Sequence, residues 1–268
     1  RIADIVPRQL AESFETLNAL AVLDLPVSAQ YAGTVLDDGT IEEVALDARI
    51  GAGFLRPPHA ADSGVLIDEA QLRFRYERAT HTVTIEPSQF LSGNTRLNLA
   101  GRIVGDPLAS AAQGASPATP MPTLWRFELQ GSDVLLGSPD LRARPLPVER
   151  LALAGHYDLA SGEFRLDQGE LVSPEGGAQF TAAVLPGEGS PRVSLAAKLT
   201  PMSVHALKMI WPSFAAPGAY RWVNANIRSG RVTGGSLRAE FPAGLMDRVA
   251  AGGAIPDEAL QAEFTIED

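Results

Sequence analysis

Cysteine is absent from this chain of 268 residues. Its absence excludes disulfide bonds, thiolate nucleophiles and cysteine-ligated metals, and it fits an oxidising compartment as well as a reducing one. Acidic residues outnumber basic ones by 32 to 22, which gives a net charge of −10. Because proteins that bind a nucleic-acid backbone need a basic stripe, this balance argues against a nucleic-acid partner. The overall charge does not indicate a polybasic membrane patch either.

Long apolar runs and catalytic motifs are also lacking. No apolar run approaches the about 20 residues of a membrane-spanning helix. The four histidines lack metal-ligand spacing, and the chain has neither a G-x-S-x-G elbow nor a phosphate-binding loop. The acidic pairs Asp37-Asp38 and Glu42-Glu43 lie at a turn signal, where solvated charge explains them better than paired glycosidase carboxylates do. We therefore predict a protein that is not an enzyme and that uses no cofactor or metal.

Alternation of apolar and polar residues dominates what is present. Leu72, Phe74 and Tyr76 alternate with polar neighbours, as Trp125, Phe127 and Leu129 do later. Such a period of two predicts β-strands with one buried face. We predict a mainly β fold, a repeating antiparallel β-meander sheet with three to four short helices. The helices are expected near residues 7–20, 201–211, 217–228 and 243–250, with Thr200 or Ser203 as the cap of the second.

The strand pattern repeats within the chain. Residues 67–103 align with residues 148–184 at a constant offset of 81, without a gap. A repeated meander predicts that like strands stack beside like strands. The aligned pairs include Leu72 with Leu153, Tyr76 with Tyr157, Val83 with Phe164, Ile85 with Leu166, and Leu99 with Phe180.

Residues 106–122 are small, polar and rich in proline, which predicts a long flexible loop. This loop divides the chain into two possible sub-units, 1–105 and 123–268. The chain opens abruptly and ends inside an alternating run, so we expect it to be a segment of a longer protein, with any membrane anchor outside it.

The stretch from Trp211 to Phe241 forms a compact unit in the sequence. Ala219, Trp222 and Ile227 fall on one predicted helical face, so we expect the Trp222 ring to be buried against the sheet. Gly230 ends the helix, and Leu237, Ala239 and Phe241 return to strand alternation.

This order of WP, AP, RWV and then RSGRVTGG resembles the central signature of the AsmA-like family of bacterial envelope proteins, in particular its YhdP-like branch. The likeness is distinctive over this stretch and is at the level of pattern elsewhere. It implies a sheet that is curled or trough-like with an apolar inside. It further implies a fragment of a larger repeat protein, periplasmic and anchored to the inner membrane. It also implies a role in phospholipid traffic toward the outer membrane and in the outer-membrane barrier.

The alternation and the resemblance together give a candidate lipid-binding face. Phospholipid acyl chains are the expected partner, with other envelope proteins as a further possibility. The same face also fits the closed core of a β-sandwich, which alternation alone does not distinguish from an open trough. The candidate residues are Leu72, Phe74, Tyr76, Val83, Ile85, Leu97, Leu99, Leu153, Tyr157, Phe164 and Leu166.

A second function fits the same pattern. A structural or protein-binding β module, for example one that assists the assembly of outer-membrane proteins, would use exposed sheet edges to add a strand from its partner. Co-purified phospholipid would favour the first function over this alternative.

Overall fold

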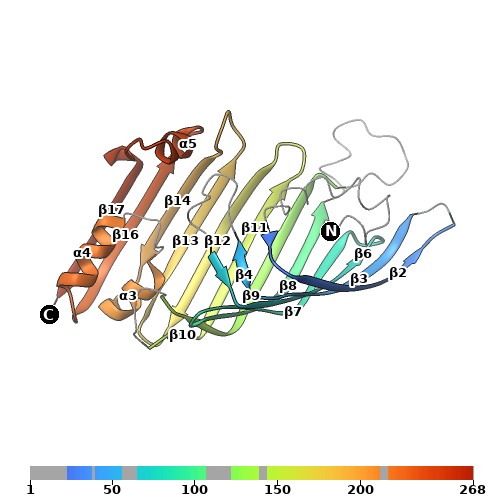
Figure 1. Cartoon of the computed structure of the whole chain (residues 1–268), viewed down its shortest axis with the longest axis horizontal. Coiled ribbons are helices and arrows are strands. Elements are labelled where there is room, and N and C mark those ends of the chain that lie inside the picture. The colour runs from blue at the N-terminus through green and yellow to red at the C-terminus, as the bar shows by residue number, and fades with distance from the viewer. Residues whose placement is uncertain are drawn as a thin grey trace.

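The computed structural model describes residues 23–37, 40–55, 65–106, 122–138, 144–211 and 217–267. The expected helix at 7–20 and most of the expected loop at 106–122 lie outside these ranges. The described residues form one antiparallel sheet of 14 strands, a separate sheet of three short strands, and a few short helices (Figure 1). The prediction of a mainly β, antiparallel fold is thereby confirmed.

The large sheet contains most of the strands, and the small sheet is built by β1 (Leu23–Asp24), β4 (Gly53–Leu55) and β5 (Val65–Ile67). The strands of the large sheet are β2 (Val27–Val35), β3 (Ile41–Ile50), β6 (Glu69–Glu77), β7 (Thr82–Ser92), β8 (Thr95–Asp106), β9 (Leu124–Leu136), β10 (Leu146–Val148), β11 (Arg150–Asp158), β12 (Glu163–Ser173), β13 (Gly176–Leu185), β14 (Arg192–Leu199), β15 (Met202–Ser203), β16 (Arg231–Phe241) and β17 (Leu260–Glu267).

Most neighbours in the sheet are consecutive in the chain, as expected of a meander. The order runs from β2 at one edge through β3, β6, β7, β8, β9, β11, β12, β13, β14 and β16, and β17 pairs with the far side of β16. Strand β8 pairs with β9, so the sheet is continuous across the position of the expected loop.

The boundaries of the strands recur at the offset of the predicted repeat. Adding 81 to the bounds of β5, β6 and β7 gives the bounds of β10, β11 and β12. A β-bulge recurs at the same offset: β7 carries one extra residue between Ile85 and Ser88, and β12 carries one between Leu166 and Gly169. Pro87 lies in the first bulge, where its missing amide donor breaks no ladder bond. The two units thus share their local twist as well as their strands.

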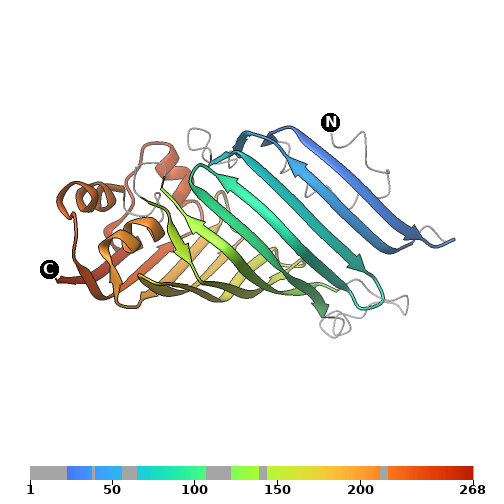
Figure 2. The same ribbon diagram turned by 90° about the horizontal axis from the view of Figure 1, so that it is seen from below.

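The sheet is strongly curled rather than flat. Strands β2–β8 turn out of the plane of β11–β17, and the two halves face each other across a shared concave side (Figures 1 and 2). The right-handed twist of successive strands, increased by the bulges, gives such curvature.

Helices occupy the end of the molecule near β17. They are α3 (Val204–Ile210), α4 (Pro217–Asn226) and α5 (Leu245–Ala250), with one 3-10 turn, η3 (Asp257–Ala259). Ser203 caps α3 by accepting a hydrogen bond from the Ala206 amide at 2.9 Å. Helix α3 begins later than the predicted residue 201 because Met202 and Ser203 first pair with β16.

The best-packed core surrounds α3. Leu146, Met202, Val204 and Val232 are almost completely buried there, together with Leu207. The ring of Trp211 packs beside this cluster, with its centroid 5.5 Å from that of Phe264 and 6.1 Å from that of Tyr220. The chain therefore fixes α3 and α4 to the C-terminal end of the sheet by ordinary close packing.

The prediction that Trp222 is buried is wrong. Its side chain is 60% exposed, whereas Tyr220 and Val223 on the same helix are 5% and 2% exposed. The hydroxyls of Tyr220 and Ser138 lie 3.0 Å apart within hydrogen-bonding distance. With Tyr220 and Val223 turned inward, the 100° step of the helix leaves Trp222 on the outer side.

Candidate functional site: a one-sided apolar surface

Residues directly opposite each other on neighbouring strands share a face of the sheet. Following the pairing from β2 to β17 therefore gives complete rows of side chains. We define the first row by Tyr31, Leu46, Phe74, Ile85, Gly101, Leu129, Leu153, Gly169, Phe180, Ala197, Leu237 and Ala262.

The second row lies beside the first on the same face and contains Gly33, Val44, Tyr76, Val83, Ile103, Phe127, Gly155, Leu166, Ala182, Leu195, Ala239 and Leu260. Neither row contains a charged residue. The tyrosine hydroxyls are their only polar side-chain groups. The two rows, together with the residues that lie beside them on the same side of the sheet, form what we call the apolar face.

The structure brings all eleven sequence-predicted residues onto the apolar face. Three of them belong to the first row and three to the second, and the other five lie beside these rows. The first row holds Phe74, Ile85 and Leu153, and the second holds Tyr76, Val83 and Leu166. Leu72 lies opposite Ala48, Leu97 opposite Phe90, Leu99 opposite Gly131, and Tyr157 opposite Phe164.

Much of this face is accessible to solvent. Leu72 is 43% exposed and Phe164 is 37% exposed, and most of the other large side chains in the rows are only half-buried. The rings of Phe127 and Phe164 stack with centroids 5.5 Å apart, so they cover each other in part. A closed sandwich would bury residues of this kind almost completely. The described residues are thus those of an open face rather than of a closed two-sheet core.

The apolar face is the concave one. Leu199, Phe264 and Ile266 belong to it by their pairing, and they pack against the buried residues of α3. Helices α3 and α4 lie on the side toward which the N-terminal strands curl (Figure 2). The curl therefore gathers the apolar rows on its inner side.

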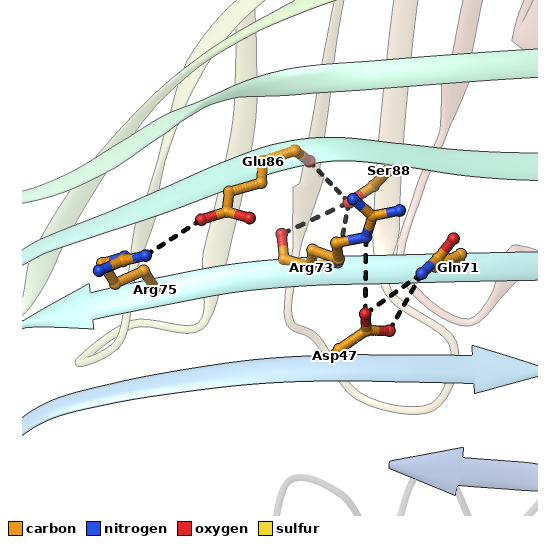
Figure 3. A network of polar contacts seen from close by, with 6 residues as sticks. All are labelled: Asp47, Gln71, Arg73, Arg75, Glu86 and Ser88. Carbon is orange, nitrogen blue, oxygen red and sulfur yellow. Dashed lines mark hydrogen bonds and ion pairs between the residues drawn. The ribbon is translucent and has the colours of Figure 1, made fainter. Parts of the chain in front are cut away.

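The opposite, convex face carries charge. Arg75 lies 3.5 Å from Glu86, and Arg73 lies 3.6 Å from Asp47 (Figure 3). Arg75 also lies 3.2 Å from Glu43. Gln71 donates to both carboxylate oxygens of Asp47 at 3.2 Å. These residues are partly exposed, and such surface ion pairs add little stability. They make the convex face polar, in contrast to the apolar rows of the concave face.

Similar pairs continue along the convex face. Two of them join Arg102 to Glu128 and Arg150 to Glu170, each at 2.8 Å. The arginines of strands β6–β11 that thus lie beside carboxylates of neighbouring strands are Arg73, Arg75, Arg102, Arg126 and Arg150.

Glycine shapes the apolar face where two rings cross a strand. A Cβ atom on Gly155 would lie 2.7 Å from the Phe127 ring, and one on Gly169 would lie 2.4 Å from the Phe180 ring. The missing side chains let these rings lie flat against the sheet. The surface formed by the rows is therefore flat and continuous where they cross β11 and β12.

Tyr76 is one of the titratable residues of the face. Burial raises the pKa of the Tyr76 phenol above its usual range, and the nearby charge of Arg78 opposes this effect. The tyrosine is therefore neutral at physiological pH, and its ring serves as apolar surface with one hydroxyl.

The described surface also has shallow hollows. One of about 520 Å³ lies at strand ends and is lined by Ser173, Glu175, Ser203 and Arg231 among others. Among the described residues no group of His, Asp and Glu has the arrangement of a metal site. None of the described helices is both long and apolar enough to span a membrane.

Sequence reasoning missed the ends of the rows. Tyr31 and Leu46 extend the face on β2 and β3, and Leu195 and Leu237 extend it on β14 and β16. The signal was present, because Val44, Leu46 and Ala48 alternate with polar residues just as the predicted ones do.

Comparison of the chain with protein-family models, curated proteins and solved structures finds no match.

Proposed function

We propose that this chain is a non-catalytic module that binds phospholipid acyl chains on its concave apolar face. The observation that carries the proposal is the pair of uncharged rows that run across twelve strands while remaining half-exposed. Soluble monomers rarely expose such a large contiguous apolar surface unless it binds something. An acyl chain needs apolar contact along its length and no specific polar partner, which these rows offer.

The AsmA-like resemblance gives the proposal its setting. In that setting the chain is a periplasmic segment that conducts phospholipid between the inner and outer membranes and supports the outer-membrane barrier. The net charge of −10 suits a protein whose ligand is recognised by its acyl chains rather than by phosphate at this face.

The direct test is extraction of the purified protein with organic solvent, followed by mass spectrometry for phospholipid. We expect wild type to carry phospholipid and Phe74→Glu to lose it, because a charge in the first row has no partner there and strongly disfavours an apolar ligand. Thr84→Glu is the matched control, since Thr84 is exposed on the neighbouring strand and faces the convex side. Equal lipid content in both variants would contradict the proposal.

A protein-binding β module remains the second candidate because of the edge strand β2. All of its residues except Val27 are exposed, and none is charged. Uncharged, exposed edges readily accept a further strand. Ala29→Pro would remove an amide donor from the free side of this edge, because Ala29 and Ala48 form a non-hydrogen-bonded pair of the β2–β3 ladder. Loss of partner binding with unchanged phospholipid content would favour this second candidate.

A further inference from the structure

The charge of this chain is strongly segregated. Residues 189–239 hold seven of the 22 basic residues and none of the 32 acidic ones. The overall charge of −10 therefore hides a basic segment inside an acidic protein. Salt limits the reach of exposed charges to about 10 Å, so a local surface is governed by its own residues and not by the total.

The arginines around α4 differ from those of the convex face in their surroundings. Arg221, Arg228 and Arg231 are exposed, and among the described residues none of them forms an ion pair. Arg75 and Arg102 on the convex face, by contrast, lie beside carboxylates. The acidic residue nearest in the pairing is Glu267, which is opposite Arg231 on β17 and also exposed.

An exposed tryptophan lies next to Arg221 on α4. Of residues 220–226, whose side chains the structure describes, Arg221, Trp222, Ala225 and Asn226 are exposed and share the outer side of the helix. Buried Tyr220 and Val223 hold the opposite side of the helix in place, so this outer side is fixed. We call Arg221, Trp222 and Arg228 the basic aromatic surface.

We propose that the basic aromatic surface binds the surface of an anionic lipid bilayer. Guanidinium groups match phosphate with paired hydrogen bonds, and an indole ring prefers the boundary between headgroups and acyl chains. An unpaired basic cluster attracts an anionic leaflet at a distance, and Trp222 adds apolar contact at the boundary. This inference goes beyond the proposed function, because it needs no lipid on the concave face.

Helix α4 lies where the apolar rows end, so its contact with a bilayer also affects the position of the rows. The helix lies at the C-terminal end of the molecule, beside β16 and β17 (Figures 1 and 2). The two apolar rows end at the same place, on Ala262 and Leu260 of β17. Contact of α4 with a bilayer would bring that end of the rows toward the membrane surface.

Vesicle flotation tests the proposal with the full chain. We expect binding to vesicles of phosphatidylcholine mixed with phosphatidylglycerol, little binding to phosphatidylcholine alone, and loss of binding at high salt. A double Arg221→Ala, Arg228→Ala variant should bind the mixed vesicles about 25-fold less tightly, at about fivefold for each arginine. The matched control is the Arg75→Ala, Arg102→Ala double variant, which removes the same charge from the convex face and should bind as wild type does.

Tryptophan fluorescence supplies a second readout. We expect a blue shift of the emission on mixed vesicles in wild type, and its loss in Trp222→Phe, because Trp125 and Trp211 are already partly buried. Absence of binding to mixed vesicles would overturn the proposal, as would equal losses in the two double variants. Phe74→Glu should still bind vesicles, so a failure of the acyl-chain proposal is distinguishable from a failure of this one.

Discussion

Gly162 shows how single residues set the turns between the long strands. It has a φ of 70° in the turn that joins β11 to β12, and its amide donates to the Asp158 carbonyl at 2.8 Å. The side chain of Asp158 accepts a hydrogen bond from the Ala160 amide, which lowers the pKa of this carboxyl. His81 occupies the equivalent position of the first unit, with a φ of 47°. The turn geometry is therefore retained even where glycine is not.

Gly162→Ala should destabilise the protein by about 1–2 kcal/mol, because a left-handed backbone disfavours a Cβ atom. That atom would also lie 2.9 Å from Cγ of Pro186. Gly234→Ala is the control, since no atom lies within 4 Å of its added Cβ. Urea-induced unfolding measures both, and equal losses would show that the turn tolerates a side chain.

Truncation of Trp222 and truncation of Leu207 should change the stability of the protein by very different amounts. Trp222→Ala is expected to change the free energy of unfolding by under about 1 kcal/mol, because the ring is exposed. Leu207→Ala should cost about 2–5 kcal/mol, since its side chain lies in the core around α3. Thermal or urea unfolding would decide, and a large loss for Trp222→Ala would place its ring in the core.

At the scale of elements, the strands differ in how well they are held. Strand β2 is an edge strand with almost every residue exposed, whereas β12 has neighbours on both sides and several buried residues. Local opening is easiest where few apolar contacts are lost and backbone groups already meet water.

Hydrogen exchange should reveal this difference. We expect amides of β2 to exchange well before those of β12, which pairs with both β11 and β13. Exchange followed by mass spectrometry on peptides covering residues 27–35 and 163–173 measures it. Equal protection would mean that the edge of β2 is covered in solution.

The strands and helix α4 also show which structural features the sequence predicts and which it does not. Alternation predicted the strands and the shared face of Phe74, Ile85 and Leu166, because the period of two is a direct consequence of strand geometry. It did not predict the bulges, which shift the alternation by one residue and depend on the partner strand. For α4, apolar Tyr220, Trp222 and Val223 left the helical phase ambiguous, and contact with Ser138 resolved it.

At the scale of the whole molecule, substitution of an apolar residue by a charged one has different effects in an open face and in a closed core. Leu166→Glu places a carboxylate in the second row, where the half-buried surroundings still admit water. We expect this variant to unfold cooperatively with a modest loss of stability, together with loss of bound phospholipid. In a dry core the same carboxylate would prevent folding. Thermal unfolding and lipid analysis on one preparation separate these outcomes, and an unfolded variant would contradict the open face.

The length of the apolar rows bears on stoichiometry. Twelve strands side by side, at about 4.8 Å between neighbours, span about 50 Å. One leaflet of a bilayer core is about 15 Å thick, so an extended acyl chain covers only about three strands. Under the proposed function, several lipid molecules would lie end to end along the apolar rows of one protein molecule. The amount of bound lipid should then rise in steps with the number of 81-residue units, rather than saturate at one molecule per protein.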